Sequence, residues 1–430
     1  MKPSAMPRAQ APSAPREQSG LSLVEVMVGL AIGVIVVFGL VELLANTSAT
    51  YQREEAFGRL QENGRVAALI AARQMRQSRT TECKSLPRHE LSGTLTVKSC
   101  HLLENDEDCS GDHVLSTDRA MGYDNSQDLD TSGALADLPK TIADNVSARW
   151  LLGDILVTWG ADAKSVAVAD PVGANGTGQI NVPSMGKGLL GKEDVAMISN
   201  CRHAHVFTVS GPEHPSDAGF VDHAAGVNTN DHLRGSDLYA GSSLYNRDPN
   251  DPRALLNRLN YRVFYVCCTK DGSLQSGDDV DYCRPGSGSY DPDQYRPALC
   301  AFDLNNGAKS DVLVPDIADM RVTYTGDSTG DGQTDFRADD HDTLRTAAWV
   351  SANNAWAGVR SASVELLLTT DADNTAMEPS KPAEWIPEDW AKDVGDDALG
   401  DDYDEEDNRL YQRIRFDVAL RPSTPWAIWD

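Results

Sequence analysis

The stretch from residue 327 to residue 339 carries oxygen-bearing side chains at the spacing of a calcium-binding loop. Oxygen ligands fall at loop positions 1, 3, 5 and 9, which are Asp327, Thr329, Asp331 and Asp335. Gly332 stands at position 6, where the sharp turn of an EF-hand-type loop needs glycine, and the carbonyl of Gln333 serves position 7. Position 12 is Ala338 and not the bidentate glutamate, so Asp339 or Asp340 has to replace it. A polar Asp-Gly hairpin turn explains the same residues, so both interpretations stay open.

Catalytic motifs are absent from the sequence. There is no nucleophile elbow, no P-loop and no dinucleotide-binding glycine pattern after a predicted strand. The 65 acidic residues make chance pairs of carboxylates common, so such pairs do not indicate a hydrolase. We therefore predict a structural protein without enzymatic activity, and Ca²⁺ is the one cofactor for which the sequence offers a candidate site.

The cysteines are even in number and spread from residue 83 to residue 300. They are Cys83, Cys100, Cys109, Cys201, Cys267, Cys268, Cys283 and Cys300. Eight cysteines allow 105 pairings, but the equal spacing of 83–100 and 283–300 favours those two pairs. The two adjacent cysteines point to opposite faces if they lie in a strand, so they need different partners. No spacing typical of a zinc site occurs.

The charge of the chain excludes several classes of protein. The net charge is −27, which argues against a nucleic-acid-binding protein and against a polybasic membrane-surface protein. Residues 388–407 contain eleven acidic residues and one basic residue, Lys392. This composition is typical of a solvated insertion, and a loop that docks a partner or collects cations is the alternative.

Short apolar stretches separated by Gly, Pro, Asn and Asp follow residue 80 and predict a β-rich region. The strand candidates are 154–159, 194–199, 205–210, 261–266, 320–324, 363–369 and 414–420. The polar stretch 211–260 is predicted to form long surface loops. Residues 46–80 are predicted to form an amphipathic helix, with Phe57, Leu60, Ala67 and Ile70 at roughly helical spacing. The predicted fold is therefore α+β.

The apolar segment 21–45 precedes that helix and is continuous with it. Twenty-five helical residues span about 37 Å, which is enough to cross a bilayer. Residues 1–20 carry Lys2, Arg8 and Arg16, so the positive-inside rule places them in the cytoplasm and the bulk of the chain outside. In an ordinary signal peptide the small residue follows the apolar run, whereas here Gly20 precedes it. A plain signal anchor leaves the carboxylate of Glu25 inside the membrane segment unexplained.

The sequence from Gly20 to Glu25, followed by an apolar helix, resembles the processing signal of type IV pilins and type II secretion pseudopilins. The resemblance implies that a prepilin peptidase cuts between Gly20 and Leu21 and that the new first residue is N-methylated. Leu21 replaces the usual Phe. Glu25 becomes the fifth residue of the mature chain, where it can meet the terminal amine of a neighbouring subunit, so that two buried charges compensate each other.

Sequence segments after residue 190 resemble those of PilW-type minor pilins. They lie at 193–210, 296–304, 316–335, 356–370 and 411–423. The resemblance implies a low-abundance subunit of the type IV pilus that primes pilus assembly and sits at or near the tip. Its implied partners are other minor pilins, the major pilin, the prepilin peptidase and a tip adhesin, and the associated processes are cell adhesion and twitching motility.

These inferences divide the chain into a cleaved cytoplasmic leader (1–20), a transmembrane and assembly helix (21–45), its amphipathic continuation (46–80) and a β-rich, disulfide-containing head (81–430) that includes the acidic segment 388–407. The chain is predicted to lie in the inner membrane with a periplasmic head and then to join a surface pilus. A minor pseudopilin of a type II secretion system is the first alternative. A signal-anchored extracellular enzyme or binding module is the second.

Overall fold

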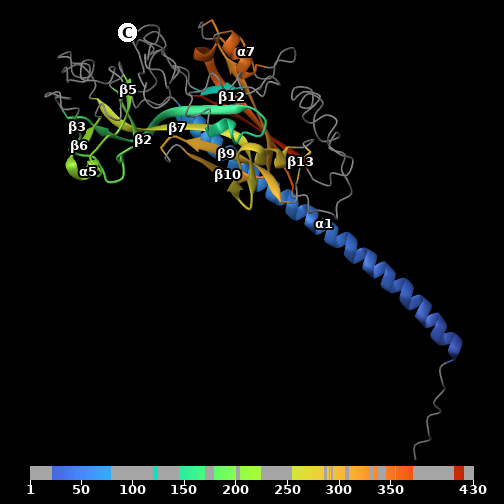
Figure 1. Cartoon of the computed structure of the whole chain (residues 1–430). Helices are drawn as coiled ribbons and strands as arrows, with labels where there is room; N and C mark the ends of the chain where they lie inside the picture. Colours follow the sequence, from blue (N-terminus) through green and yellow to red (C-terminus); the bar gives the residue numbers. More distant parts are fainter. Residues whose placement is uncertain are drawn as a thin grey trace, which may run out of the picture. The chain divides into compact units, whose positions relative to one another are not determined.

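The computed structural model describes 22–78, 120–123, 145–169, 179–199, 204–223, 254–284, 288–289, 291, 294–305, 309–329, 333–337, 345–353, 355–370 and 411–420. The chain divides into two compact units, Met1–Glu54 and Glu55–Asp430. A single helix, α1 (Leu23–Gln77, 55 residues), runs through the boundary between them (Figure 1). The two helical segments expected at 21–45 and 46–80 are therefore one element.

The second unit is an α+β structure, which confirms the predicted fold class. Its largest sheet is antiparallel, with the strand order β1-β2-β7-β4-β5, and β7 also pairs with β9 and β8 while β9 pairs with β10. The strands are β1 (Ala120–Tyr123), β2 (Ile155–Ala167), β4 (Val195–Ser199), β5 (Ala204–Thr208), β7 (Leu255–Lys270), β8 (Ser273–Leu274), β9 (Tyr295–Asp303) and β10 (Lys309–Pro315).

Two smaller antiparallel sheets complete the second unit. One has the order β11-β12-β13, formed by β11 (Ile317–Gly326), β12 (Val359–Thr369) and β13 (Tyr411–Ala419). The other pairs β3 (Gln179–Asn181) with β6 (Phe220–Asp222). Short helical elements connect the strands: α5 (Pro215–Ala218), η1 (Gly277–Cys283), α7 (Ala347–Ala352) and η2 (Trp356–Gly358).

All seven predicted strands are present, and most extend beyond the predicted bounds. The expectation that 211–260 forms only loops is wrong for its described parts. They contain α5, β6 and the first residues of β7, and Val221 is fully buried. A three-residue strand and a four-residue helix are too short to produce a periodic sequence pattern, so the sequence does not indicate them.

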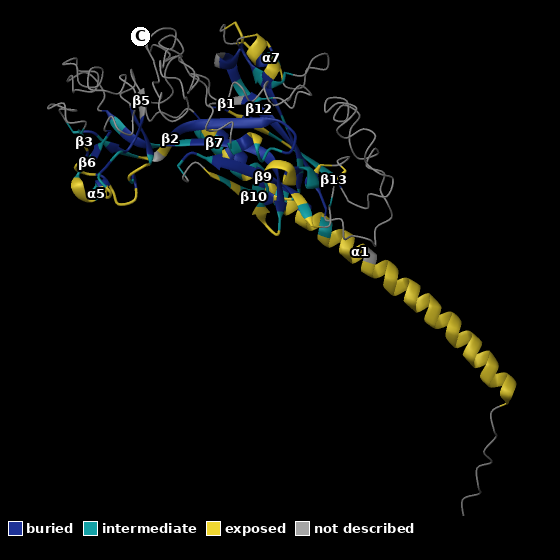
Figure 2. Ribbon diagram, in the orientation of Figure 1, coloured by how far each residue is buried: buried dark blue, intermediate teal, exposed yellow. Residues whose placement is uncertain are grey.

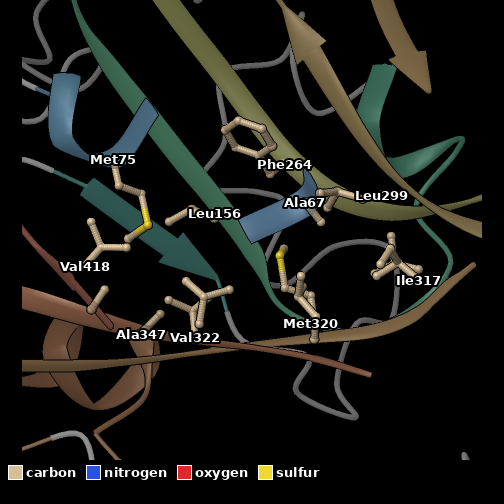
Figure 3. Packing of buried hydrophobic residues seen from close by; sticks show 14 of the residues in the cluster. Ala67, Met75, Leu156, Phe264, Leu299, Ile317, Met320, Val322, Ala347 and Val418 are labelled. Atoms are coloured by element: carbon tan, nitrogen blue, oxygen red, sulfur yellow. The ribbon is translucent and has the colours of Figure 1, made fainter. Parts of the chain in front are cut away.

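The second half of α1 packs on the sheets of its own unit. Leu60, Ala67 and Met75 are buried in a cluster with residues of β2, β7, β9, β11 and β12, and Figure 3 shows Ala67 and Met75 among Leu156, Phe264 and Met320. The reason is that small and apolar residues recur on one face of the helix while polar residues fill the other. The expected amphipathic helix is thereby confirmed for its described part.

Two hydrogen bonds fix the position of this half-helix. The Asn63 side-chain amide donates to an Asp316 carboxylate oxygen at 3.0 Å, and the Asn260 amide on β7 donates to the Gln74 side-chain oxygen at 2.7 Å. Because hydrogen bonds are directional, the pair sets the helix position more narrowly than apolar packing alone.

Strand β7 separates two cores. Phe264 and Val266 face the cluster beneath α1, whereas Val263 and Tyr265 face a second cluster on the other side of the sheet. A third cluster lies around β3, β4, β5 and β6. A strand that is buried on both faces reads as a continuous apolar run, which explains the near-unbroken burial of the second half of β7.

Candidate membrane and assembly helix

The first turn of α1 presents the one acidic residue expected inside the apolar segment. The Ser22 carbonyl accepts hydrogen bonds from the backbone N–H groups of Glu25, at 3.0 Å, and Val26, at 3.2 Å, and so begins the helix. Glu25 therefore lies in the first turn, where the partial positive charge of the helix end favours a carboxylate. Gly20 and Leu21 lie outside the described residues, so the cleavage and methylation site stays a prediction.

The apolar residues after Glu25 are exposed along their whole length. Every side chain that the structure describes between Ser22 and Glu54 is exposed, and Phe38 reaches 72% (Figure 2, yellow). Burial of such surface is worth about 25 cal/mol per Å², so water is an unfavourable environment for it. The helix is long and apolar enough to cross a membrane, although a signal sequence would meet the same criteria of length and composition.

One face of this segment is hollowed by glycine. A methyl group added at Gly29 or Gly33 would meet nothing within 4 Å. The shallow apolar groove here is lined by Val26, Gly29, Leu30, Gly33, Val34, Val37, Phe38 and Val41. Small residues four positions apart let a second helix approach closely within a bilayer.

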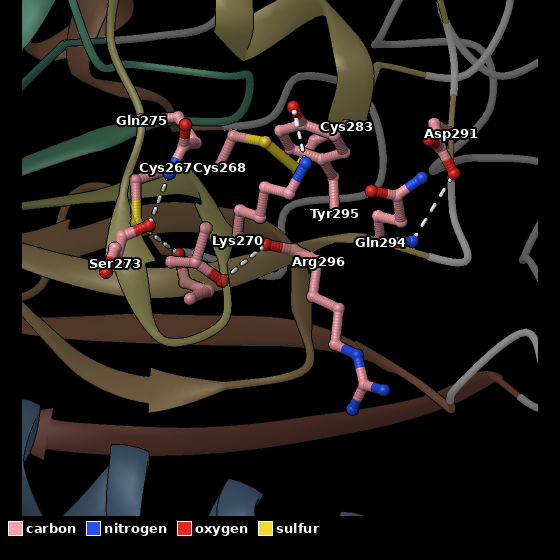
Figure 4. The surroundings of a disulfide bond; sticks show 12 residues. Cys267, Cys268, Lys270, Ser273, Gln275, Cys283, Asp291, Gln294, Tyr295 and Arg296 are labelled. Atoms are coloured by element: carbon pink, nitrogen blue, oxygen red, sulfur yellow. Dashed lines mark hydrogen bonds between the residues drawn. A yellow bond between two sulfur atoms is a disulfide. The ribbon is translucent and has the colours of Figure 1, made fainter.

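The disulfides place adjacent cysteines in different cores. Cys267 bonds to Cys300 on β9, with a Cα–Cα distance of 5.9 Å. Cys268 bonds to Cys283 of η1, with a Cα–Cα distance of 5.6 Å (Figure 4). The prediction that the two neighbours have different partners is confirmed.

The predicted pair Cys283–Cys300 is wrong. Equal sequence spacing carries no information about which cysteines the strands bring together. Cys300 is on the face of β9 that meets Cys267, whereas Cys283 joins the opposite core together with Cys268. Cys83, Cys100, Cys109 and Cys201 lie outside the described residues. Disulfides persist in oxidising compartments, which indicates that the head lies outside the cytoplasm.

In the candidate calcium loop, the carboxylates that the structure describes bind to other groups of the protein. One Asp327 carboxylate oxygen is 2.6 Å from the Arg360 guanidinium, and the side chain of Asp327 is only 3% exposed. The Asp335 carboxylate accepts hydrogen bonds from the backbone N–H groups of Ser328, at 2.8 Å, and Thr329, at 2.9 Å. These hydrogen bonds lower the pKa of Asp335 below its usual value. The arrangement is that of a closed turn.

Asp331 and Asp339 lie outside the described residues, so the calcium set as a whole stays a prediction. Among described residues, no group of three or more His, Cys, Asp or Glu side chains is placed to hold a metal ion. Gln333 and Thr329 are described, but neither adds a carboxylate. The acidic segment 388–407 is also outside the described residues.

A nearly buried carboxylate that is paired with two arginines is a feature that the sequence did not predict. The carboxylate of Glu365 on β12 lies 2.6 Å from Arg413 and 3.5 Å from Arg415, both on β13, and its side chain is 9% exposed. Loss of both arginines would leave the buried carboxylate of Glu365 uncompensated. The partners are far apart in the sequence, and only the register of β12 on β13, which sets Glu365 opposite Arg415, brings them together.

No family model, curated protein or solved structure matches the chain.

Proposed function

We propose that this chain is a minor subunit of a type IV pilus. In this proposal the prepilin peptidase cuts between Gly20 and Leu21, the apolar part of α1 holds the subunit in the inner membrane, and the head lies on the periplasmic side before assembly. The subunit then helps to prime the filament and remains at or near its tip.

The observation that carries the proposal is the uninterrupted helix α1. Its first part is exposed and apolar, and its last part is docked on a disulfide-bonded β-rich head. A helix of this kind needs a membrane before assembly and other helices after it, because its apolar surface is unfavourable in water in either state. Glu25 is the one charge in this helix before Glu42.

Glu25 supports the proposal through its position in the first turn. A carboxylate within a bilayer costs about 2.5–3.5 kcal/mol or more, and a cationic partner removes most of that cost. The free amine that cleavage creates at Leu21 lies one turn before Glu25, so the amine of an adjacent subunit at the same depth can neutralise the carboxylate.

The Glu25→Ala variant tests this role. We expect it to stay in the membrane fraction but to fall about tenfold or more in the sheared filament fraction, because the charge that fixes the register between subunits is gone. Glu42→Ala, at the other end of the apolar segment, is the matched control and should assemble as the wild type does. Equal recovery of Glu25→Ala and wild type in sheared filaments would contradict the proposed role of Glu25 in assembly.

Mass spectrometry of the N-terminus tests the proposed pathway itself. The expected mature chain begins with N-methylated Leu21 in both the membrane and the sheared fractions. A mature chain confined to the membrane would indicate a type II secretion pseudopilin. A chain that begins near Met1 would indicate a signal anchor and would overturn the proposal.

A further inference from the structure

Strand β13 (red in Figure 1) is an edge strand of the three-stranded sheet of the head. Among the residues that the structure describes, β12 is the one strand that pairs with it, over all nine residues from Tyr411 to Ala419. An edge strand presents main-chain N–H and C=O groups with which another chain can pair. The free side of β13 is therefore a candidate docking edge.

The pairing of β13 with β12 shows which of its main-chain groups point outward. The backbone N–H of Leu420 donates to the Arg360 carbonyl at 2.8 Å, so these two residues form a hydrogen-bonded pair. In an antiparallel ladder such pairs alternate with pairs whose main-chain groups point away from the partner strand. Arg415, Asp417 and Ala419 belong to the second kind, and all three residues are exposed. This part of the edge is thus accessible to an incoming strand.

Three other edge strands of the head, β1, β5 and β10, are short or irregular, whereas β13 is neither. β1 has four residues and β5 has five. β10 has a register shift between Val312 and Val314 and ends in Pro315, and both features hinder pairing at an edge. β13 has nine residues, no proline and no register shift on β12. Its charged side chains, among them Arg415 and Asp417, then decide which strand can pair with it.

The side chains on the two faces of β13 define the strand that fits it. On the face away from α1, the side chains of Arg415 and Asp417 are 42% and 71% exposed. Arg415 lies 3.5 Å from Glu365, whose closer partner is Arg413 at 2.6 Å, so the Arg415 guanidinium keeps donors for a further carboxylate. On the face toward α1, Phe416 packs against the core cluster and is only partly buried.

We infer that the edge of β13 from Arg415 to Ala419 binds an extended segment of another protein chain as a fourth, antiparallel strand of this sheet. The antiparallel direction continues that of β11, β12 and β13. Residues directly opposite each other on paired strands interact. The segment therefore carries an acidic side chain opposite Arg415, a basic one opposite Asp417 and, between them, an apolar one that covers Phe416. Because the pair is antiparallel, the basic residue precedes the acidic one by two positions.

A second copy of β13 would also set Arg415 opposite Asp417, but this pairing conflicts with the proposed function. The two-fold axis of such a pair is perpendicular to the sheet, so it reverses the direction of the α1 segment that packs on the sheet. Two chains that leave the same face of a membrane through α1 need the same direction. The choice of a different chain as the partner therefore rests on the proposed function.

Binding of a labelled synthetic peptide to the full-length chain in detergent tests the inference. The peptide alternates valine with a lysine and, two positions later, a glutamate, and the control peptide has these two charges exchanged. We expect fluorescence anisotropy to show binding of the first peptide and several-fold weaker binding of the control, because like charges then face Arg415 and Asp417. No binding of the first peptide, or equal binding of both peptides, overturns the inference.

Substitutions at Asp417 separate the main-chain contact from the charge. Asp417→Pro removes an outward N–H that β12 does not use, and should weaken binding of the first peptide about tenfold. Asp417→Ala keeps this N–H and should weaken binding several-fold less than proline does. Asp417→Lys should shift the preference to a peptide with glutamate at both charged positions. Denaturant unfolding checks the fold of each variant. Equal binding by the proline and alanine variants, or an unchanged preference in Asp417→Lys, would contradict strand pairing at this edge.

The outcomes for the docking edge and for the proposed function are separable. A dimer in light scattering that Asp417→Pro converts to a monomer assigns the edge to a second copy and overturns the inference. If the chain that begins at Leu21 enters sheared filaments but the first peptide does not bind, the docking edge is wrong and the proposed function stands. If the first peptide binds and the chain still begins near Met1, the docking edge stands and the proposed function fails.

Discussion

At the scale of single residues, the structure shows how burial and pairing decide the behaviour of ionisable groups. His223 is 4% exposed, follows β6 and lies against Phe207, with ring centroids 5.5 Å apart. Loss of hydration disfavours the charged imidazolium and lowers the pKa of His223 to about 4. In the unfolded chain its pKa is about 6.5.

This difference makes the stability of the head depend on pH. Between about pH 4 and pH 6.5 the unfolded chain binds more protons at this site than the folded chain, so stability rises with pH in that window. The His223 contribution is complete above pH 6.5 and is lost as pH falls toward 4, at a total cost of about 3 kcal/mol.

We predict that His223→Gln reduces the loss of stability between pH 7 and pH 5. Denaturant unfolding of the full chain in detergent at both values measures the effect. His214→Gln, at an exposed histidine, is the control and should keep the pH dependence of the wild type. The same pH dependence in His223→Gln and in the wild type would argue against this account.

At the scale of elements, strand β7 is the central strand of the largest sheet in the head. It pairs with β2, β4, β8 and β9, and its two adjacent cysteines bond into opposite cores. Close to the Cys268–Cys283 bond, Nζ of Lys270 lies 4.5 Å from the Tyr295 ring centroid (Figure 4). The ring of Tyr282 stacks on that of Tyr295. Each disulfide thus ties a different neighbour to the same strand.

We predict that peptide mapping without reduction recovers Cys267–Cys300 and Cys268–Cys283, and no Cys283–Cys300. The bonds close loops with sequence separations of 33 and 15. Replacing both cysteines of one bond with alanine should lower the free energy of unfolding by about 4 kcal/mol for the first and about 3 kcal/mol for the second, as chain-entropy arguments indicate. Recovery of the Cys283–Cys300 peptide would contradict the arrangement around β7.

At the scale of the whole molecule, the two units meet different physical demands. The described side chains of the first unit are exposed and mostly apolar, which suits lipid or other helices. The second unit buries its apolar side chains in three clusters, and α1 contributes Leu60, Ala67 and Met75 to one of them. The last turns of α1 are therefore part of the head itself.

We predict that Met75→Ala lowers the free energy of unfolding of the head by about 2–5 kcal/mol, because the side chain is 1% exposed and its loss leaves a cavity. Leu69→Ala, at an exposed position of the same helix, should change it by less than about 0.5 kcal/mol. Denaturant unfolding of both full-length variants makes the comparison. Equal effects would mean that α1 does not dock through Met75.

The sequence by itself determined the elements with strong periodic patterns. Residue order predicts these elements because side chains repeat every 3.6 residues in helices and every 2 in strands. They are the apolar run that contains Glu25, the amphipathic continuation around Leu60 and Ala67, and the seven strands. The opposite directions of Cys267 and Cys268 follow from the same alternation.

Only the tertiary structure decided which distant residues meet. Strand register and packing between segments that lie far apart in the chain determine the partners of the cysteines. They also determine the ion pairs Glu365–Arg413 and Asp327–Arg360 and the burial of His223. Local spacing contains no information about register across a sheet, and a shift of one residue would turn a strand side chain such as Glu365 to the other face of its sheet.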